Sequence, residues 1–248
     1  MNQGGHSVWE HVQNQLESSG SNPTRPLHYL RIGKSAASSF VKKHHYSHSH
    51  PGGIDFCFGI RQEDVLVGAS MFGYMAGNPK GMCVCEGIED ASRYRELMRL
   101  VLIDELPKNS ESRFIGWCLR WLKKHTELAA IISFADPKYG HTGVIYKASN
   151  WIYTGMQKPD RPRIFLEHTD LFGTYEKEIH PRQAVDTFGS SSREAIGKSR
   201  LSPREPKHRF VYFLRPGLKL KARMENISYG AIMQAIQGQA IKQTKGGE

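Results

Sequence analysis

The sequence lacks any run of about 18 uncharged apolar residues, the length that a membrane-spanning helix requires. We therefore expect no membrane span and no membrane partner. The first residues also lack the apolar core of a secretory signal, which predicts a protein that stays inside the cell. With 248 residues, 39% of them hydrophobic, the chain is long enough for one soluble globular domain with an appended tail.

Cysteine is scarce, and the four cysteines form no recognisable framework. Cys57, Cys83, Cys85 and Cys118 include no CxxC pair. The spacing of Cys83 and Cys85 is tighter than that of ordinary zinc ligands. The pattern therefore favours reduced thiols in a cytosolic protein.

A glycine-rich phosphate loop is missing after the apolar stretch 96–103. Acyl-CoA binding needs glycines here, because successive N–H groups must converge on the pyrophosphate. The position is instead occupied by Asn109, Ser110, Glu111, Ser112 and Arg113. A helix start still offers a positive dipole, and Arg113 and the hydroxyls can bind an anion, although Glu111 opposes it. We expect a cofactor-binding anion site formed by Asn109, Ser110, Ser112 and Arg113.

Acidic residues are nearly absent from the segment 198–223. The segment contains nine basic residues and one acidic residue, Glu205, so it carries +8 of the chain's formal charge of +10. Such a concentration of positive charge is typical of a surface that binds a nucleic-acid backbone. A solvated basic tail without a partner is the alternative. The nucleic-acid interpretation predicts phosphate contacts from Lys198, Arg200, Lys207, His208 and Arg209.

The spacing of apolar residues predicts alternating helices and strands. We expect helices at 32–46, 109–125 and 142–149, and strands at 54–60, 65–75, 96–103, 128–136, 151–153, 163–168 and 208–214. The strands at 54–60 and 65–75 are typical of a hairpin. We expect the strand at 163–168 to extend the same sheet. This order predicts an α/β (α+β) fold, a mixed sheet with helices on both faces.

Asp136 and Tyr146 are the first candidates for chemistry. Asp136 directly follows the apolar stretch "IISFA", where partial desolvation makes a carboxylate a competent base, and polar groups at the ends of central strands tend to meet in a ligand crevice. An Asp that caps the turn before Pro137 is an equal alternative. Tyr146 lies on the next helix and could donate a proton or orient a substrate; alone, it reads equally as a packing residue.

Arg99 interrupts the apolar strand "LMRLVL". A guanidinium in a central strand must be paired or must face a cavity, because burial without a partner is costly. We expect Arg99 to clamp a carboxylate or a phosphate of a cofactor. Half of a structural ion pair is the alternative.

The loop "KKHHYSHSHPGG" after the first helix gathers histidines and a tyrosine. One interpretation is a metal site in which His48, or a neighbouring histidine, binds a metal together with Asp136. The spacing matches no closed zinc motif. The competing interpretation is a polar lip over the active site, to which His45 and Tyr46 contribute catalytic groups.

These segments resemble the bacteriophage Mom family of DNA adenine-modification proteins, which have a fold of the GNAT acetyltransferase type. The resemblance spans about residues 28 to 214. It rests on "HHYSHSHPGG", "LVGASMFG", "ELMRLVLIDELPKNSESRFIGWCLRWLKK", "IISFADPKYGHTGVIYKASNWIYTG" and "DTFGSSSREAIG…KHRFVYFL", in this order. The resemblance implies a mostly antiparallel sheet and a catalytic domain at 28–180. It places this domain between a polar arm at 1–27 and a basic DNA-binding extension at 181–224, which is followed by a tail at 225–248.

The resemblance also implies an activity. The expected enzyme is a phage transferase that converts N6 of adenine in DNA to a carbamoylmethyl (acetamido-type) adduct in the bacterial cytoplasm and so protects the DNA from host restriction. The resemblance places Arg99, Ser112, Asp136 and Tyr146 at positions where the family has functional residues. The expected cofactors are acetyl-CoA or a related acyl donor and, since the family has been linked to it, iron. The expected partners are DNA and, as an option, a second copy in a homodimer.

A duplex hides its bases, so such an enzyme must flip the adenine out or act on single strands. We expect the aromatic side chains of Tyr46 and Tyr139 to stack on the base. An ordinary GNAT N-acetyltransferase that acts on a protein or a small amine is the first alternative. A non-catalytic DNA-binding protein, in which Asp136 and Tyr146 serve as turn and packing residues, is the second.

Overall fold

The computed structural model describes residues 25–46, 48–49, 51–75, 83–157, 163–171, 173–179, 200–202 and 206–221. Several predictions from the sequence fall elsewhere. The polar arm up to residue 24, Lys198 and the tail from residue 225 all lie outside these residues. The four cysteines are described, and all are free and buried.

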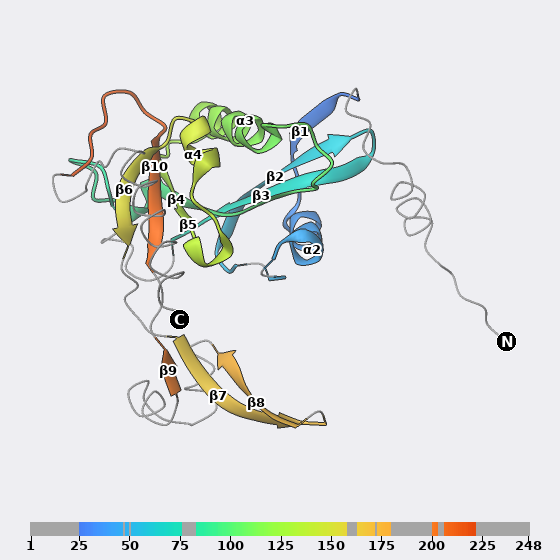
Figure 1. Ribbon diagram of the computed structural model, residues 1–248. Helices are drawn as coiled ribbons and strands as arrows, with labels where there is room; N and C mark the ends of the chain where they lie inside the picture. The colour runs from blue at the N-terminus through green and yellow to red at the C-terminus, as the bar shows by residue number, and fades with distance from the viewer. Residues whose placement is uncertain are drawn as a thin grey trace, which may run out of the picture. The chain divides into compact units, whose positions relative to one another are not determined.

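A seven-stranded sheet forms the centre of the fold (Figure 1). Its strand order is β1-β2-β3-β4-β5-β10-β6. The strands are β1 (Leu27–Arg31), β2 (Ile54–Gln62), β3 (Val65–Gly73), β4 (Tyr94–Leu102), β5 (Ala130–Ala135), β6 (Ile152–Gln157) and β10 (Lys207–Phe213). The pairs β1/β2, β2/β3 and β3/β4 are antiparallel, whereas β4/β5 is parallel. The apolar β4 is central, as its composition predicts.

The predicted hairpin is confirmed. Gln62 pairs with Val65 across a two-residue turn, and Glu63 adopts a positive φ of 55° there. A two-residue hairpin turn requires this left-handed backbone, because it matches the twist of the flanking strands. Strand β1 is a feature that the sequence reading missed.

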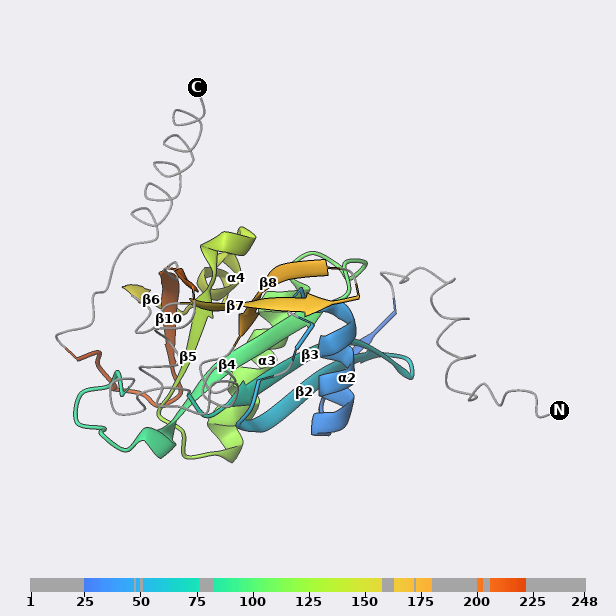
Figure 2. The same cartoon turned by 90° about the horizontal axis from the view of Figure 1, so that it is seen from below.

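Helices cover both faces of this sheet. They are α2 (Lys34–His44), α3 (Ser110–His125) and the short α4 (Val144–Ala148), with 3-10 turns η2 (Ala91–Arg93) and η3 (Pro137–Tyr139). Figures 1 and 2 show α2 on one face and α3 with α4 on the other. The predicted fold class, a mixed and mostly antiparallel sheet with helices on both faces, is confirmed. None of the helices in the described part of the chain has the length and hydropathy to span a membrane.

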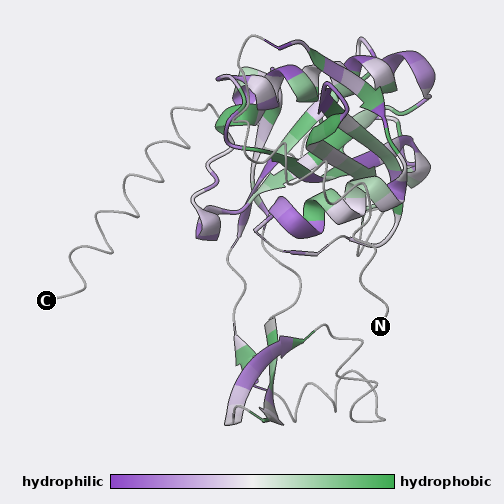
Figure 3. Ribbon diagram, turned by 90° about the vertical axis from the view of Figure 1, so that its right-hand side faces the viewer, coloured by the Kyte–Doolittle hydropathy of each residue, from purple (hydrophilic) through white to green (hydrophobic). Residues whose placement is uncertain are grey.

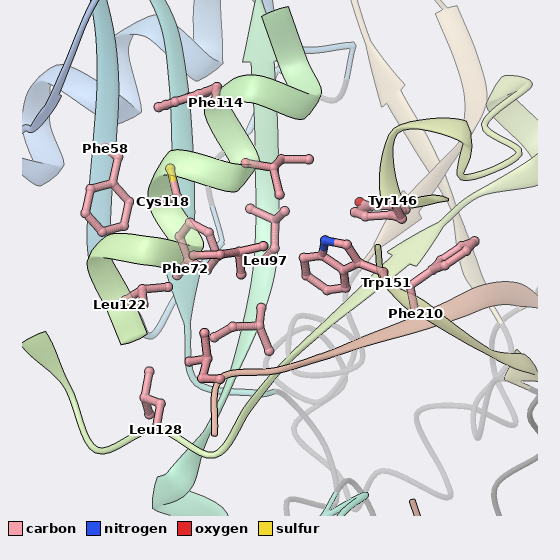
Figure 4. Packing of buried hydrophobic residues seen from close by; sticks show 14 of the residues in the cluster. Phe58, Phe72, Leu97, Phe114, Cys118, Leu122, Leu128, Tyr146, Trp151 and Phe210 are labelled. Atoms are coloured by element: carbon pink, nitrogen blue, oxygen red, sulfur yellow. The ribbon is translucent and has the colours of Figure 1, made fainter. Parts of the chain in front are cut away.

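Apolar side chains are buried between the helices and the sheet. Figure 3 shows hydrophobic residues along the strands of this sheet. On the α3 face, Phe114, Cys118 and Leu122 of the helix are fully buried against Phe58 and Phe72 of the strands (Figure 4). This stripe recurs every three to four residues, the period that brings one helix face to the sheet. The amphipathic pattern therefore explains why the segment 109–125 is a helix.

A second, three-stranded sheet lies in a separate unit of the chain. Its order is β8-β7-β9, with β7 (Arg163–Asp170), β8 (Gly173–Ile179) and β9 (Arg200–Ser202) all paired antiparallel. The chain divides into one unit of 1–135, 142–155 and 209–248 and another of 136–141 and 156–208. The prediction that 163–168 extends the main sheet is wrong. This strand pairs with its sequence neighbour β8, which apolar spacing did not reveal because every described β8 side chain before Ile179 is exposed.

Candidate functional site

The parallel strands β4 and β5 part in the middle of the main sheet. Their register runs from Tyr94↔Ala130 to Glu96↔Ile132 and then ends. Directly beyond it, the buried Ser133 Oγ donates a hydrogen bond of 2.9 Å to the carbonyl oxygen of Leu97. A side chain thus bridges the strands where the backbone ladder has stopped. We call this place the strand fork.

Tyr146 reaches the strand fork from α4. Its hydroxyl lies 2.7 Å from Ser133 Oγ. Ser133 gives its one hydroxyl hydrogen to the Leu97 carbonyl, so Tyr146 is the donor in this bond. The ring is 7% exposed and stacks on Phe210 with 4.8 Å between ring centroids (Figure 4).

Burial raises the pKa of Tyr146 to about 12, although the hydrogen bond to Ser133 lowers it. The charges of Glu96 and Tyr46 act in the same direction as burial. The phenol is therefore neutral at ordinary pH and can serve as a proton donor, not as a base. Glu96 is an acid that the sequence reading missed, because it stands at the first residue of the predicted strand 96–103 and not inside it, as Arg99 does.

The loop after α2 contributes the next group of predicted residues. His45 is buried, and its ring lies 4.1 Å from the ring of the half-exposed Tyr46. Because Tyr46 acts electrostatically on Tyr146, the structure brings these two predicted catalytic tyrosines into one neighbourhood. Arg99 ties the loop to β4, since its Nε donates to the Ser49 carbonyl at 3.3 Å.

Asp136 ends β5 and belongs to the other unit. One carboxylate oxygen accepts a hydrogen bond of 3.1 Å from the Lys138 N–H and so caps η3. The other lies 3.0 Å from Lys207 Nζ. The side chain is 14% exposed. The capping role that the sequence left open is therefore real, and a shared cavity with Tyr146 stays a prediction.

Serine hydroxyls at the start of α3 form hydrogen bonds with backbone carbonyls of the same segment. Ser110 Oγ donates to the Pro107 carbonyl at 2.6 Å, and Ser112 Oγ donates to the Asn109 carbonyl at 3.0 Å. Asn109 makes no side-chain cap and adopts a left-handed backbone with φ of 66°. Arg113 remains exposed, with its guanidinium 3.4 Å from Ser110 Oγ. Of the predicted anion ligands, Asn109 and Arg113 are exposed.

Most of the basic residues of segment 198–223 that the structure describes are engaged within the fold. Arg200 forms a two-pronged ion pair with Glu176, Lys207 pairs with Asp136, and Lys221 pairs with Glu89 at 2.6 Å. Arg209 donates to the side chain and carbonyl of Thr154 at 2.8 and 3.1 Å. His208 is 2% exposed, and its burial lowers its pKa. Counting residues therefore overstates the charge that this segment offers to DNA.

The described residues do not fit an iron site. They contain no group of three or more His, Cys, Asp or Glu side chains placed to hold a metal. His48 Nδ1 lies 3.0 Å from the Lys42 carbonyl, and both oxygens of Asp136 are engaged as described above.

The exposed aromatic residues remain candidates for base stacking. Tyr46 is 45% exposed and Tyr139 is 49% exposed. Lys138 Nζ lies 5.7 Å from the centre of the Tyr139 ring, which places a cation beside an aromatic face. This combination suits a nucleobase next to a phosphate.

Two comparisons of the sequence with known proteins point to the same family. The Mom protein family profile matches residues 27–231. The methylcarbamoylase mom of Escherichia phage Mu is 33% identical over 124 residues, 49% of this chain and 51% of that protein, so the match spans about half of the relative's length.

Solved structures resemble the chain more weakly. Spermidine N-acetyltransferase from Vibrio cholerae, in complex with CoA and spermine, is 9% identical, with a TM-score of 0.41 over 76% of this chain and 95% of that chain. The GphF GNAT-like decarboxylase in complex with isobutyryl-CoA is 10% identical, with a TM-score of 0.43 over 76% of this chain and all of the other. The profile match covers most of the sequence, and on that ground the chain belongs to the Mom protein family.

Proposed function

We propose that this chain transfers a carbamoylmethyl (acetamido-type) group to N6 of adenine in DNA and thereby protects phage DNA from host restriction. The observation that carries the proposal is the neutral, buried hydroxyl of Tyr146 at the strand fork. Family membership and the name of the phage Mu relative, methylcarbamoylase, support the reaction class.

The chemistry assigns a role to each group. The N6 lone pair of adenine is delocalised into the ring, so attack by N6 requires removal of its proton. Asp136 accepts this proton, and Tyr146 donates a proton to the departing group. A bond forms between N6 and the methylene carbon of the carbamoylmethyl group, while the bond from that carbon to the departing group of the donor breaks. The adenine must leave the duplex stack first, and Tyr46 and Tyr139 stack on it when it does.

The strand fork suits an acyl donor of the coenzyme A type. Two observations fit such a group: the ladder between β4 and β5 has ended there, and the indole nitrogen of Trp151 is a buried donor without a hydrogen-bond partner in the described residues. Arg113 at the start of α3 and Arg99 on β4 would hold the anionic part of the donor. When bound, such a donor would supply the carbamoylmethyl group, so it must itself carry that group; acetyl-CoA would give N6-acetyladenine and serves here as a probe of the coenzyme A site.

Mass spectrometry of nucleosides tests the proposal. DNA from cells that make the parent chain should contain an N6-substituted adenine, and DNA from cells that make Tyr146→Phe should contain about 100-fold less. The phenylalanine keeps the stacking on Phe210 and removes only the proton donor. Unmodified DNA in cells with abundant parent protein would refute the function.

A second candidate function follows from the engagement of the basic segment. Because Arg200, Lys207 and Lys221 pair with carboxylates, an N-acetyltransferase for a protein or small amine would need no phosphate-binding surface. Tight binding of acetyl-CoA by calorimetry, without affinity for DNA, would favour this alternative.

A further inference from the structure

Trp151 carries an unexplained donor in the core of the protein. The residue is 7% exposed, and its Nε1–H is buried without a hydrogen-bond partner in the described part of the chain. Such a group loses its hydrogen bond to water without replacing it, which destabilises the folded protein. Native proteins retain few unsatisfied donors of this kind, and each calls for a physical reason.

The position of the indole links it to the strand fork. The Trp151 backbone N–H donates to the Tyr146 carbonyl at 3.0 Å, so the two residues are tied through the main chain. Their rings meet edge to face, with 5.1 Å between centroids. Figure 4 shows the indole nitrogen on the side of the ring toward Tyr146. The unused donor therefore belongs to a ring that packs directly against the ring of Tyr146, the residue to which we assign proton transfer.

Neighbouring polar groups do not use this donor. The Leu97 carbonyl accepts from Ser133, and the Tyr146 hydroxyl is itself bonded to Ser133. The face of the Tyr146 ring offers at most a weak acceptor. Arg215 Nε is also buried without a hydrogen-bond partner in the described residues. It differs from Trp151 Nε1 because its guanidinium is partly exposed and already donates to the Lys123 and Thr126 carbonyls.

We infer that Trp151 Nε1–H binds a carbonyl oxygen of the acyl donor at the strand fork. The inference rests on the proposed function, because it assumes that a donor binds there. An uncharged carbonyl suits the site better than a carboxylate or phosphate. The indole is a neutral donor in apolar surroundings, where an unpaired anion would be costly. Trp151 is thus a binding residue for the donor, with its contact formed when the carbonyl enters between β4 and β5.

An isosteric replacement separates this role from packing. The change Trp151→β-(3-benzothienyl)alanine keeps the shape of the ring and removes the N–H. We expect the thermal unfolding midpoint without ligand to stay the same or to rise, because a buried unsatisfied donor is lost. Affinity for the acyl donor should fall about tenfold. The same replacement at Trp121, which packs in the same core cluster, is the control and should leave donor affinity unchanged.

A direct readout is available from the indole signals. The chain has four tryptophans, so its ¹H–¹⁵N spectrum contains four indole resonances, and Trp151→Phe assigns the relevant one. Saturating acetyl-CoA should move the Trp151 resonance downfield and leave that of Trp121 in place. If acetyl-CoA binds, as calorimetry shows, and the Trp151 resonance does not move, the inference is overturned. A lower unfolding midpoint in the benzothienyl variant would also overturn it.

Failure of the proposed function would be visible separately. If the parent does not modify adenine in cells, the function fails whatever Trp151 does. If the parent modifies adenine but does not bind acetyl-CoA, the choice of donor is wrong. The amount of modified adenine in cells that make the benzothienyl variant then tests the role of Trp151. Modification at the parental level then overturns the role of Trp151, whereas a loss of about tenfold supports it.

Discussion

Tyr146 has surroundings that differ clearly from those of an ordinary surface tyrosine. It is buried, stacked on Phe210, and hydrogen-bonded as a donor to Ser133. These contacts are also what a purely structural tyrosine would make. The distinction between the two roles depends on removing the hydroxyl and measuring stability and activity together.

The raised pKa of Tyr146 predicts a loss of stability in alkali. Its ordinary value is 10.0, and burial raises it to about 12. Above pH 10 the unfolded chain therefore releases a proton that the folded chain keeps, and the free energy of unfolding falls as pH rises toward 12. The slope for one such group approaches about 1.4 kcal/mol per pH unit.

Urea denaturation of the parent and of Tyr146→Phe on both sides of pH 10 measures this contribution. The phenylalanine variant should lose less stability than the parent over the same pH interval. The buried Tyr94 and Cys118, whose pKa values burial also raises, contribute equally to both proteins and cancel. Identical slopes would mean that the Tyr146 hydroxyl ionises as easily in the folded chain as in the unfolded one.

Asp136 offers a test of catalysis against capping. Asp136→Asn should reduce adenine modification at least about 100-fold, because an amide cannot accept the N6 proton. Asp90 is a matched control, since it caps η2 through Ser92 just as Asp136 caps η3 through Lys138. Asp90→Asn should modify DNA at the parental level. Equal activity of both variants in nucleoside analysis would assign Asp136 to the turn alone.

Among the secondary-structure elements, the strand fork and α4 carry the proposed site. Sequence spacing predicted β4, β5 and α4 because apolar periodicity marks each of them, and the resemblance pointed to Tyr146. The fork itself was not predictable, since the register of β4 against β5 depends on partners distant in sequence. Ser133 and Trp151 were missed for the same reason: a serine in a strand and a tryptophan after a helix look ordinary until their neighbours are known.

The start of α4 depends on a glycine. Gly143 has a φ of 82°, and a side chain there would overlap the ring of Phe210, on which Tyr146 stacks. Gly143→Ala should lower the free energy of unfolding by about 3 kcal/mol through backbone strain and overlap together. Gly140→Ala is the control, because Gly140 has a similar φ of 72° and open space around it.

Chemical denaturation of the two alanine variants separates these effects. Gly140→Ala should lose only the backbone contribution, about 1 kcal/mol. If Gly143→Ala proved no less stable than Gly140→Ala, the packing of α4 against Phe210 would not hold Tyr146 in place as we describe.

At the scale of the whole molecule, charge and division into units matter most. The sequence predicted a basic surface, but the described part of segment 198–223 places several of its cations against carboxylates. A linear count of charges cannot anticipate such pairs, because Glu89, Asp136 and Glu176 lie far from their partners in sequence. DNA binding through this segment would have to compete with these ion pairs.

Salt dependence of DNA binding tests this competition. Lys207→Gln should weaken binding to single-stranded DNA and make the dependence on salt shallower by about one released counterion. Lys124→Gln, a change at an exposed lysine in the last turn of α3, should leave the slope unchanged. An unchanged slope in Lys207→Gln would show that Asp136, and not a phosphate, is the lasting partner of this lysine.

The central claim, transfer to N6 of adenine in DNA, is tested most directly with labelled substrate. DNA carrying ¹⁵N at the exocyclic amine of adenine is incubated with the parent chain in an extract of host cells, and its nucleosides are analysed by tandem mass spectrometry. We expect a substituted adenine whose added group remains attached to ¹⁵N on fragmentation, and its loss with Tyr146→Phe. An added group on another atom or base, or none at all, would contradict the account.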